Sequence, residues 1–598
     1  MSENLPLADQ SADEGVWRAL VEKSLKGARW ERLVSRTAEG LEIKPLYRET
    51  DFATSTDVSG FPGAAPFVRG ARTNGPWLVR QSYDHPDLEH TNRDILADLQ
   101  GGVGAIELVV DPAGARGIAV KDARDLDRAL ADVIIEAAPV SLDAGAHATD
   151  IAPLLIAKLK GVAAPGTALN IDLLAQPDTH RAAALDLAIA ASQAHPHLSA
   201  LRIDARPFHE SGGGETQEIA AALATGVWYL RLLTERGMAA DDAARILRFS
   251  LAVGADVLVE AAKLRALRLC WARVTEAFAV APENRAAHIH AFTSRRTLTR
   301  YDAWTNILRV TTSAFAAAIG GADEITTLPF TDALGVATPF ARRLARNTQN
   351  VLLEEAHLAH VADPAGGAWF AEALTRELSH AAWSIMQALE AQGGILAALQ
   401  IGEFQTDIAT ARDARMTAFA TRKETITGVT DFPLLGESAP EVARPRAEPL
   451  PYHGLAPIRW AEPFEALRGR AERITPRPAV FFANLGALSE FGPRANFARN
   501  LLAVGGIAGI GAEMEYVSGN ALLAAYKASG ALVAIICGTD ARYGDNMALT
   551  AEALRDAGCR HIILAGEPRG TDLIQQFVWS GCDAIGALRS LHAALGVA

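Results

Sequence analysis

The sequence predicts an α/β protein in which a closed (β/α)8 barrel of the TIM type is followed by a C-terminal flavodoxin-like α/β domain. Three observations lead to this prediction. Short β-branched runs alternate with long helical stretches rich in alanine and leucine over residues 61–400. A proline-rich stretch, residues 401–478, interrupts this alternation. A shorter alternation of the same kind then fills residues 479–598.

Length and composition restrict the class of protein. With 598 residues, 49% hydrophobic and 21% charged, the chain is expected to form two or more soluble globular units. A formal net charge of -13 disfavours a nucleic-acid binder, which carries clustered Lys and Arg. We find neither a secretory signal in residues 1–14 nor an apolar run of about 18 residues for a membrane span, so a cytoplasmic location is expected.

The four cysteines show no paired spacing. Burial as small apolar residues is therefore expected in preference to a zinc site or a disulfide framework, and no metal site is predicted.

Residues 1–60 form a separate N-terminal arm. Trp17, Leu20, Val21 and Leu25 recur at helical spacing, which predicts an amphipathic helix over residues 13–27. A single helix ahead of a domain must bury its apolar stripe. It can do so on its own domain or on a partner chain, and the sequence leaves both open.

The barrel prediction depends on eight apolar runs with helical segments between most of them. The predicted strands are residues 105–110, 139–142, 168–174, 201–205, 249–253, 289–293, 325–328 and 359–362. The predicted helices include residues 219–236, 257–274, 303–319 and 339–358. Eight runs with helical crossovers over this length favour a closed barrel over an open sheet.

The segment 401–478 is predicted to be a linker with only local helices, because its prolines remove backbone donors and fix φ. Trp460, Phe464 and Leu467 indicate that it lies against a domain surface. In the C-terminal domain, strands are expected at residues 479–484, 532–537 and 561–565, and helices at 495–504, 520–529, 546–557 and 573–580. Such a sheet binds ligands beyond the carboxyl ends of its strands.

Several segments, taken in order, resemble the methylmalonyl-CoA mutase family. They are APFVRG at residues 65–70 with Trp77 and residues 80–81, EAAKLRA at 260–266 with Trp271, residues 302–309 with 311–312 and 320–321, ARNTQ at 345–349 with 354–355, and DPAGG at 363–367. Each has a plainer explanation alone: Glu260 and Lys263 can be an ordinary ion pair on one helix face, and DPAGG can be only a turn. Their joint order over nearly the whole chain indicates the family.

The resemblance implies an adenosylcobalamin-dependent rearrangement that interconverts methylmalonyl-CoA and succinyl-CoA. In the family, an Asp-x-His-x-x-Gly loop of the C-terminal domain supplies a histidine to cobalt, and the aspartate orients it. Here the aspartate position falls on Leu488, the histidine position on Glu490 and the final glycine on Pro493 or neighbouring Gly492. Because no histidine occurs from residue 454 to residue 560, histidine-on cobalamin is not expected in this chain.

The barrel also departs from the family's pattern. A family tyrosine that lies over the substrate is missing from the short loop 71–75, and the position of the family's barrel histidine falls on Pro207. His209, two residues further on, is the one catalytic candidate; it can equally be an ordinary loop histidine. The family threads the pantetheine of CoA down the barrel axis, whereas strands such as residues 106–110 and 169–173 carry bulky aliphatics whose direction the sequence does not assign.

These observations favour a small, non-catalytic subunit that pairs with a large mutase subunit. That partner would bind both adenosylcobalamin and the acyl-CoA. An autonomous mutase with an atypical site at Glu490 or His209 is the alternative. A third possibility is a nucleotide-like ligand at the glycine turns near Gly486 and Gly538, although such turns are common.

Overall fold

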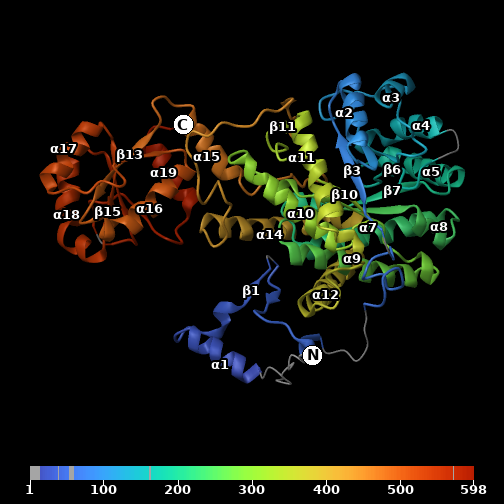
Figure 1. Ribbon diagram of the computed structural model, residues 1–598, viewed down its shortest axis with the longest axis horizontal. Coiled ribbons are helices and arrows are strands. Elements are labelled where there is room, and N and C mark those ends of the chain that lie inside the picture. Colours follow the sequence, from blue (N-terminus) through green and yellow to red (C-terminus); the bar gives the residue numbers. More distant parts are fainter. Residues whose placement is uncertain are drawn as a thin grey trace, which may run out of the picture.

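A computed structural model describes residues 14–37, 39–52, 59–73, 75–159, 163–569 and 571–597. It contains a closed barrel of eight parallel strands and a separate five-stranded parallel sheet, which lie at opposite ends of the molecule (Figure 1). Within the described residues, no helix is both long and apolar enough to cross a membrane.

The barrel strands are closed in the order β10-β3-β4-β5-β6-β7-β8-β9, with every neighbouring pair parallel. Their bounds are β3 Leu78–Tyr83, β4 Ala105–Val109, β5 Val140–Asp143, β6 Ala168–Ile171, β7 Ser199–Asp204, β8 Leu247–Val253, β9 Ile289–Thr293 and β10 Glu324–Thr326. The predicted barrel class is therefore confirmed.

One of the eight predicted strands is wrong, and one real strand was missed. Residues 359–362 do not form a strand, since the chain makes a 3-10 turn, η8, at Leu358–His360. The strand that completes the barrel is instead β3, whose sequence LVRQSY is too polar to form an apolar run. The reason is that Arg80 and Ser82 face the barrel interior, which is itself charged.

Helices surround the barrel, and the long ones pack against one another. They are α2 Leu88–Gln100, α3 Ala123–Ala129, α4 Ala148–Leu159, α5 Asp178–Ala194, α6 Arg206–Glu210, α7 Glu215–Glu235, α8 Ala240–Arg245, α9 Val257–Ala277, α10 Asn306–Ile319, α11 Pro339–Asn350, α12 Trp369–Ala391 and α13 Ile395–Ile401. Gly226 in α7 shows how close this packing is: a Cβ there would lie 2.5 Å from the ring of Trp271 in α9. The glycine, although a poor helix former, lets the two helices approach.

The N-terminal arm extends away from the barrel (Figure 1). It contains the predicted helix, α1 Glu14–Ser24, and a two-stranded hairpin of β1 Ser35–Arg36 and β2 Glu42–Ile43. None of the described residues from 15 to 48 is buried, and Leu20 is 63% exposed. The apolar stripe of α1 is thus not buried on its own domain. The arm is anchored after α1, where Glu39 accepts from the Thr216 N–H of α7 at 2.8 Å and Tyr47 packs edge-on against Phe370 of α12 with ring centroids 5.0 Å apart.

The segment 401–478 begins with an 18-residue helix, α14 Glu403–Ala420, and also contains α15 Glu462–Glu472 and β12 Arg444–Pro445. It is therefore more helical at its start than the prolines indicated. As expected, Trp460, Phe464 and Leu467 lie against a domain surface: they are buried in the same hydrophobic cluster as the C-terminal sheet.

The C-terminal sheet has the order β14-β13-β15-β16-β17, all parallel. Its strands are β13 Ala479–Asn484, β14 Ala508–Ile510, β15 Val533–Cys537, β16 His561–Ala565 and β17 Gln576–Val578, and its helices are α16 Leu488–Val504, α17 Gly519–Ser529, α18 Asp540–Asp556 and α19 Ala584–Ala594. Alternate strand residues face α16 and α19 on one side and α17 and α18 on the other. The prediction of a helix at residues 573–580 is wrong, because β17 lies there.

Candidate functional site

A chain of ion pairs crosses the barrel interior at the amino-terminal side. Arg80 of β3 donates from Nε to Glu324 Oε2 at 2.6 Å, and from Nη1 to Ser141 Oγ at 2.7 Å. Arg248 of β8 reaches the same carboxylate, with Nη2 3.1 Å from Glu324 Oε1. Since β3 and β5 are not neighbours in the barrel, and neither are β8 and β10, the Arg80–Ser141 and Arg248–Glu324 contacts pass through the barrel interior. Both arginines also donate to the Gly166 carbonyl just before β6, at 2.9 and 3.3 Å.

A second group of charges fills the carboxyl-terminal side. Glu107 of β4 accepts a hydrogen bond from Ser82 Oγ at 2.5 Å and lies 3.6 Å from Arg202 Nη1 of β7. Arg202 also pairs with Asp143 at 2.8 Å, and Arg206 bridges Asp143 and Asp204 at 3.1 and 2.5 Å. The guanidinium of Arg206 lies 4.1 Å from the ring centroid of Phe292.

These contacts assign the direction of the strand side chains, which the sequence left open. Because Glu107 points inward and strand side chains alternate, Ile106 and Leu108 point outward to the helices. Four arginines and four carboxylates occupy the interior instead: Arg80, Arg202, Arg206, Arg248, Glu107, Asp143, Asp204 and Glu324. Sequence reasoning missed them; the available signal was a charged residue in the middle of several strands.

The charges in this network stabilise one another. Burial alone raises the pKa of Asp143, but Arg202 and Arg206 outweigh it and hold that pKa at about 2. Burial likewise opposes ionisation of Glu324, and Arg248 and Arg80 keep its pKa well below the usual range. A buried charge is tolerated only with such partners.

A segment of the linker, residues 444–460, covers the carboxyl end of the barrel; we call it the strap. Arg446 pairs with Asp84 after β3 and, at 2.9 Å, with Asp332 after β10. Tyr452 donates from its hydroxyl to Asp172 Oδ2 after β6 at 2.9 Å.

Further hydrogen bonds join the strap to other loops at the same end. The backbone N–H of Ile458 donates to the carbonyl of Glu210 after β7 at 2.8 Å, and that of Trp460 to the carbonyl of Arg296 after β9 at 3.0 Å. Arg116 after β4 donates to the Glu448 carbonyl at 3.0 Å. Loops that follow six strands are thus bound by one segment, at the end where barrel enzymes place their active sites.

His209, the catalytic candidate, lies in α6 at this carboxyl end. Its Nε2 is 2.9 Å from Ser294 Oγ and its Nδ1 is 3.1 Å from Glu218 Oε2. This is the spacing of a nucleophile, base and carboxylate triad. All three side chains are nevertheless buried, and burial lowers the pKa of His209 well below its ordinary value. His209 is thus a buried imidazole with a hydrogen-bond partner on each ring nitrogen.

Glu260 and Lys263 of α9 prove to be more than a surface ion pair. Lys263 Nζ lies 2.5 Å from Glu260 Oε2 and 2.7 Å from Glu218 Oε2, and it donates to the Ala252 carbonyl at 2.5 Å, with no exposure to solvent. Burial raises the pKa of Glu260 to about 7. The lysine therefore joins α7, α9 and the end of β8.

In the C-terminal domain, the loop after β13 places Leu488 and Glu490 at the start of α16. Leu488 is 49% exposed and its backbone N–H donates to Glu515 at 2.6 Å. Glu490 accepts from the Ala487 N–H at 2.9 Å and pairs with Arg542 at 3.0 Å, and this hydrogen bond lowers the pKa of Glu490. The carboxylate is thus engaged as a helix cap and ion-pair partner.

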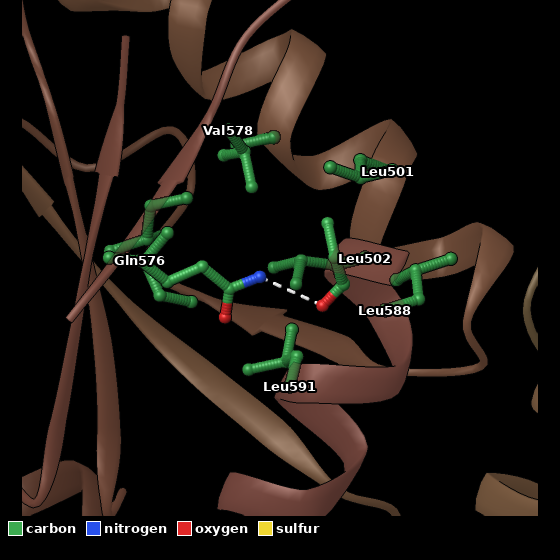
Figure 2. A pocket seen from close by; sticks show the side chains of 10 residues that line it. Leu501, Leu502, Gln576, Val578, Leu588 and Leu591 are labelled. Carbon is green, nitrogen blue, oxygen red and sulfur yellow. Dashed lines mark hydrogen bonds between the residues drawn. The ribbon is translucent and has the colours of Figure 1, made fainter. Parts of the chain in front are cut away.

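A small cavity lies between the C-terminal sheet, α16 and α19 and is lined by leucines such as Leu501 and Leu591 (Figure 2). Its volume of about 10 Å³ admits one water at most. The amide of Gln576, which points into it, donates to the Ala587 carbonyl at 2.8 Å.

These residues do not fit a histidine-on cobalamin. Leu488 cannot orient a ligand, and Glu490 offers no imidazole and is already paired with Arg542. Across the described part of the chain, no group of three or more His, Cys, Asp or Glu side chains is arranged to hold a metal ion.

By fold, then, this is a barrel protein with an appended parallel-sheet domain, whose barrel is closed at one end and filled with charge. The sequence model of methylmalonyl-CoA mutase matches residues 36–449, and the chain belongs to that family. Several of its relatives in that family are small subunits. The chain is 41% identical to the methylmalonyl-CoA mutase small subunit of Streptomyces virginiae over 97% of this chain and 96% of that one.

Other relatives agree. The chain is 36% identical to the methylmalonyl-CoA mutase small subunit of Propionibacterium freudenreichii subsp. shermanii, over 98% of this chain and 95% of that one. A methylmalonyl-CoA mutase of Cereibacter sphaeroides is 32% identical over a shorter span, 72% of this chain and 66% of that one.

Proposed function

We propose that this chain is the non-catalytic small subunit of an adenosylcobalamin-dependent methylmalonyl-CoA mutase, acting in the cytoplasm. A large subunit binds the cobalamin and the acyl-CoA in this proposal. The complex interconverts methylmalonyl-CoA and succinyl-CoA, and this chain supports its partner as scaffold.

The observation that carries the proposal is the ion-pair network across the barrel axis. A mutase barrel that threads pantetheine along its axis needs small polar inward side chains. Here Arg80 and Arg248 meet at Glu324, and Glu107 meets Arg202, so that the axis is occupied. Admitting CoA would break buried ion pairs, and each costs about 3–5 kcal/mol when one partner is lost.

The C-terminal domain supports the proposal independently. Its strand order corresponds to the flavodoxin-like order 2-1-3-4-5, and we propose that residues 479–598 are a degenerate cobalamin-binding domain. Residues 1–60, 61–400 and 401–478 are then the arm, the barrel and the linker. The engaged Glu490 and the leucine-lined core both argue that cobalamin binds elsewhere, on the partner.

The exposed arm favours a chain that binds a partner over one that acts alone. Leu20 of the apolar stripe of α1 is 63% exposed and Trp17, Val21 and Leu25 are only partly buried; a helix with an incompletely buried apolar stripe gains stability by docking. We propose that the arm docks on the large subunit in a heterodimer.

Two measurements test this function. The isolated chain, titrated with adenosylcobalamin, is expected to give no spectral shift; it is also expected to have no mutase turnover alone. Adding the large subunit should restore turnover. Tight cobalamin binding, or turnover by the isolated chain, would refute the proposal and favour an autonomous mutase.

A further inference from the structure

Several buried polar atoms of the barrel interior form no hydrogen bond with the described part of the chain. They are Arg202 Nε of β7, Arg248 Nε and Ser250 Oγ of β8, His290 Nδ1 of β9 and Glu107 Oε1 of β4. Each of these five side chains is at most 2% exposed. We call the five atoms the mid-barrel atoms. A buried donor or acceptor without a partner destabilises a fold, so five of them in one barrel require a hydrogen-bonding partner.

The mid-barrel atoms belong to side chains that face the axis. The guanidinium of Arg248 crosses the interior to Glu324, and Ser250, two residues further along β8, faces the same way. In the sheet register Arg202 lies opposite Arg248 and His290 lies opposite Ser250, so these side chains also face inward. The two groups of charges therefore meet at this wall of the barrel.

Long contacts between the charges indicate that a further group lies among them. Glu107 Oε1 is 3.6 Å from Arg202 Nη1, although β4 and β7 are not neighbours, and Arg202 Nε is 3.9 Å from Asp204 Oδ2. Both distances exceed that of a direct hydrogen bond. They are of the kind that a bridging water shortens into two good bonds.

Small side chains make room at this level of the barrel. Bulky branched residues fill the interior of an ordinary barrel of this type. Here Ser82 reaches Glu107 and Ser141 reaches Arg80 within the interior, and Ser250 faces the same space. Three serines leave more room than three branched aliphatics would.

The occupant of this space must both donate and accept hydrogen bonds. The Nε–H groups of Arg202 and Arg248 require an acceptor, whereas Glu107 Oε1 requires a donor. Burial lowers the pKa of His290 well below its ordinary value, so its ring is neutral and Nδ1 donates or accepts according to the tautomer. A simple anion cannot donate to the carboxylate and a metal cation cannot accept from the arginines. Water does both, and it adds no charge to an interior in which four arginines already face four carboxylates.

We propose that ordered water molecules occupy the middle of the barrel axis and bridge the two groups of charges through the mid-barrel atoms. The barrel interior is then a hydration site built into the fold and not a dry core. This proposal does not depend on the proposed function, because it concerns only the side chains of this chain.

A first test counts long-lived internal waters of the whole chain by oxygen-17 relaxation dispersion of the solvent. Ser250→Val fills space at the site and offers no hydrogen bond, so it should lower the dispersion amplitude. The matched control is Thr225→Val in α7: this buried hydroxyl already donates to the Ala221 carbonyl at 2.7 Å, and its loss should leave the amplitude unchanged. An unchanged amplitude in Ser250→Val overturns the proposal.

A second test uses the sign of a change in stability. If Ser250 Oγ is bonded to water, Ser250→Ala loses that bond, and the melting midpoint should fall by about 2 °C in differential scanning calorimetry. If the site is dry, the same change removes a hydroxyl without a partner, and the midpoint should rise. A rise overturns the proposal. So does a bromide ion located beside Arg202 by anomalous scattering in crystals grown with bromide, because the occupant would then be an anion.

Discussion

Replacing Arg80 by methionine tests whether the charged barrel interior is a structural element. Methionine keeps most of the stem volume but removes every polar contact of the guanidinium. Lost are the bonds to Glu324 at 2.6 Å, to Ser141 at 2.7 Å, and to the carbonyls of Ile106 and Gly166 at 2.7 and 2.9 Å.

The expected loss of stability depends on the contacts that the former partners of Arg80 keep. Removing one member of a buried ion pair costs about 3–5 kcal/mol. Glu324 keeps Arg248 at 3.1 Å, and the Ile106 carbonyl keeps the hydroxyl of Ser141 at 3.2 Å. We therefore expect the lower end, about 3 kcal/mol, which at roughly 2 °C per kcal/mol for a large domain lowers the melting midpoint by about 6 °C.

Differential scanning calorimetry measures this shift, with Arg128→Met as the matched control. Arg128 pairs with Glu89 at 2.6 Å, but both side chains are more than half exposed, so its loss should leave the midpoint essentially unchanged. If Arg80→Met melts within about 1 °C of the wild type and of this control, the network contributes little stability and the reasoning is wrong.

Three further predictions concern neighbouring groups. Lys263→Met leaves Glu218 and Glu260 without their shared cation and should lower the free energy of unfolding by about 3–5 kcal/mol in urea titration. Adding Glu260→Gln to this variant should recover part of the lost stability. If the double variant recovers none, the assigned pairing is wrong. Burial raises the pKa of Asp172 to about 6, so the stability that this carboxyl contributes is present below its ordinary pKa and is lost as pH rises through 6. Between pH 4 and pH 7, the Asp172→Asn variant should therefore become more stable relative to the wild type, by at most about 3 kcal/mol in melting curves. Parallel pH dependences of the two proteins would argue against this assignment. Arg446→Ala unpins the strap from Asp84 and Asp332 and should speed cleavage at Glu441 or Glu448 by a glutamate-specific protease, whereas Arg128→Ala should not.

The fold could be predicted from the sequence wherever strands are apolar. Residues 289–293 and 479–484 coincide with β9 and β13, because their buried side chains leave a continuous hydrophobic run. Residues 78–83 give no such run, since Arg80 and Ser82 face the charged axis. Residues 359–362 look apolar, yet His357 before them adopts a left-handed φ of 54°, and the chain turns there.

The candidate site shows more clearly which features cannot be predicted from the sequence. The sequence identifies what Leu488, Glu490 and Pro207 cannot do, because a missing side chain type can be read directly. It does not show that Glu490 is held by Arg542, 52 residues further on, or that the strap reaches Asp172, 280 residues before Tyr452. Contacts over such separations depend on the tertiary fold, and the periodicity of a segment carries no information about them.

The interior network also explains why this barrel stays closed. Because the arginines and carboxylates share partners, removing one of them weakens the support of a neighbouring charge: without Arg80, Glu324 keeps only Arg248. Shortening Arg202, for example, would open space beside Glu107 but leave Asp143 supported only by Arg206. An open axis therefore requires the joint loss of a cation and its carboxylate, in both groups of charges. In the proposed function, the same pairing that stabilises the barrel keeps a thioester chain out of it, so that this chain contributes to the mutase through its surface.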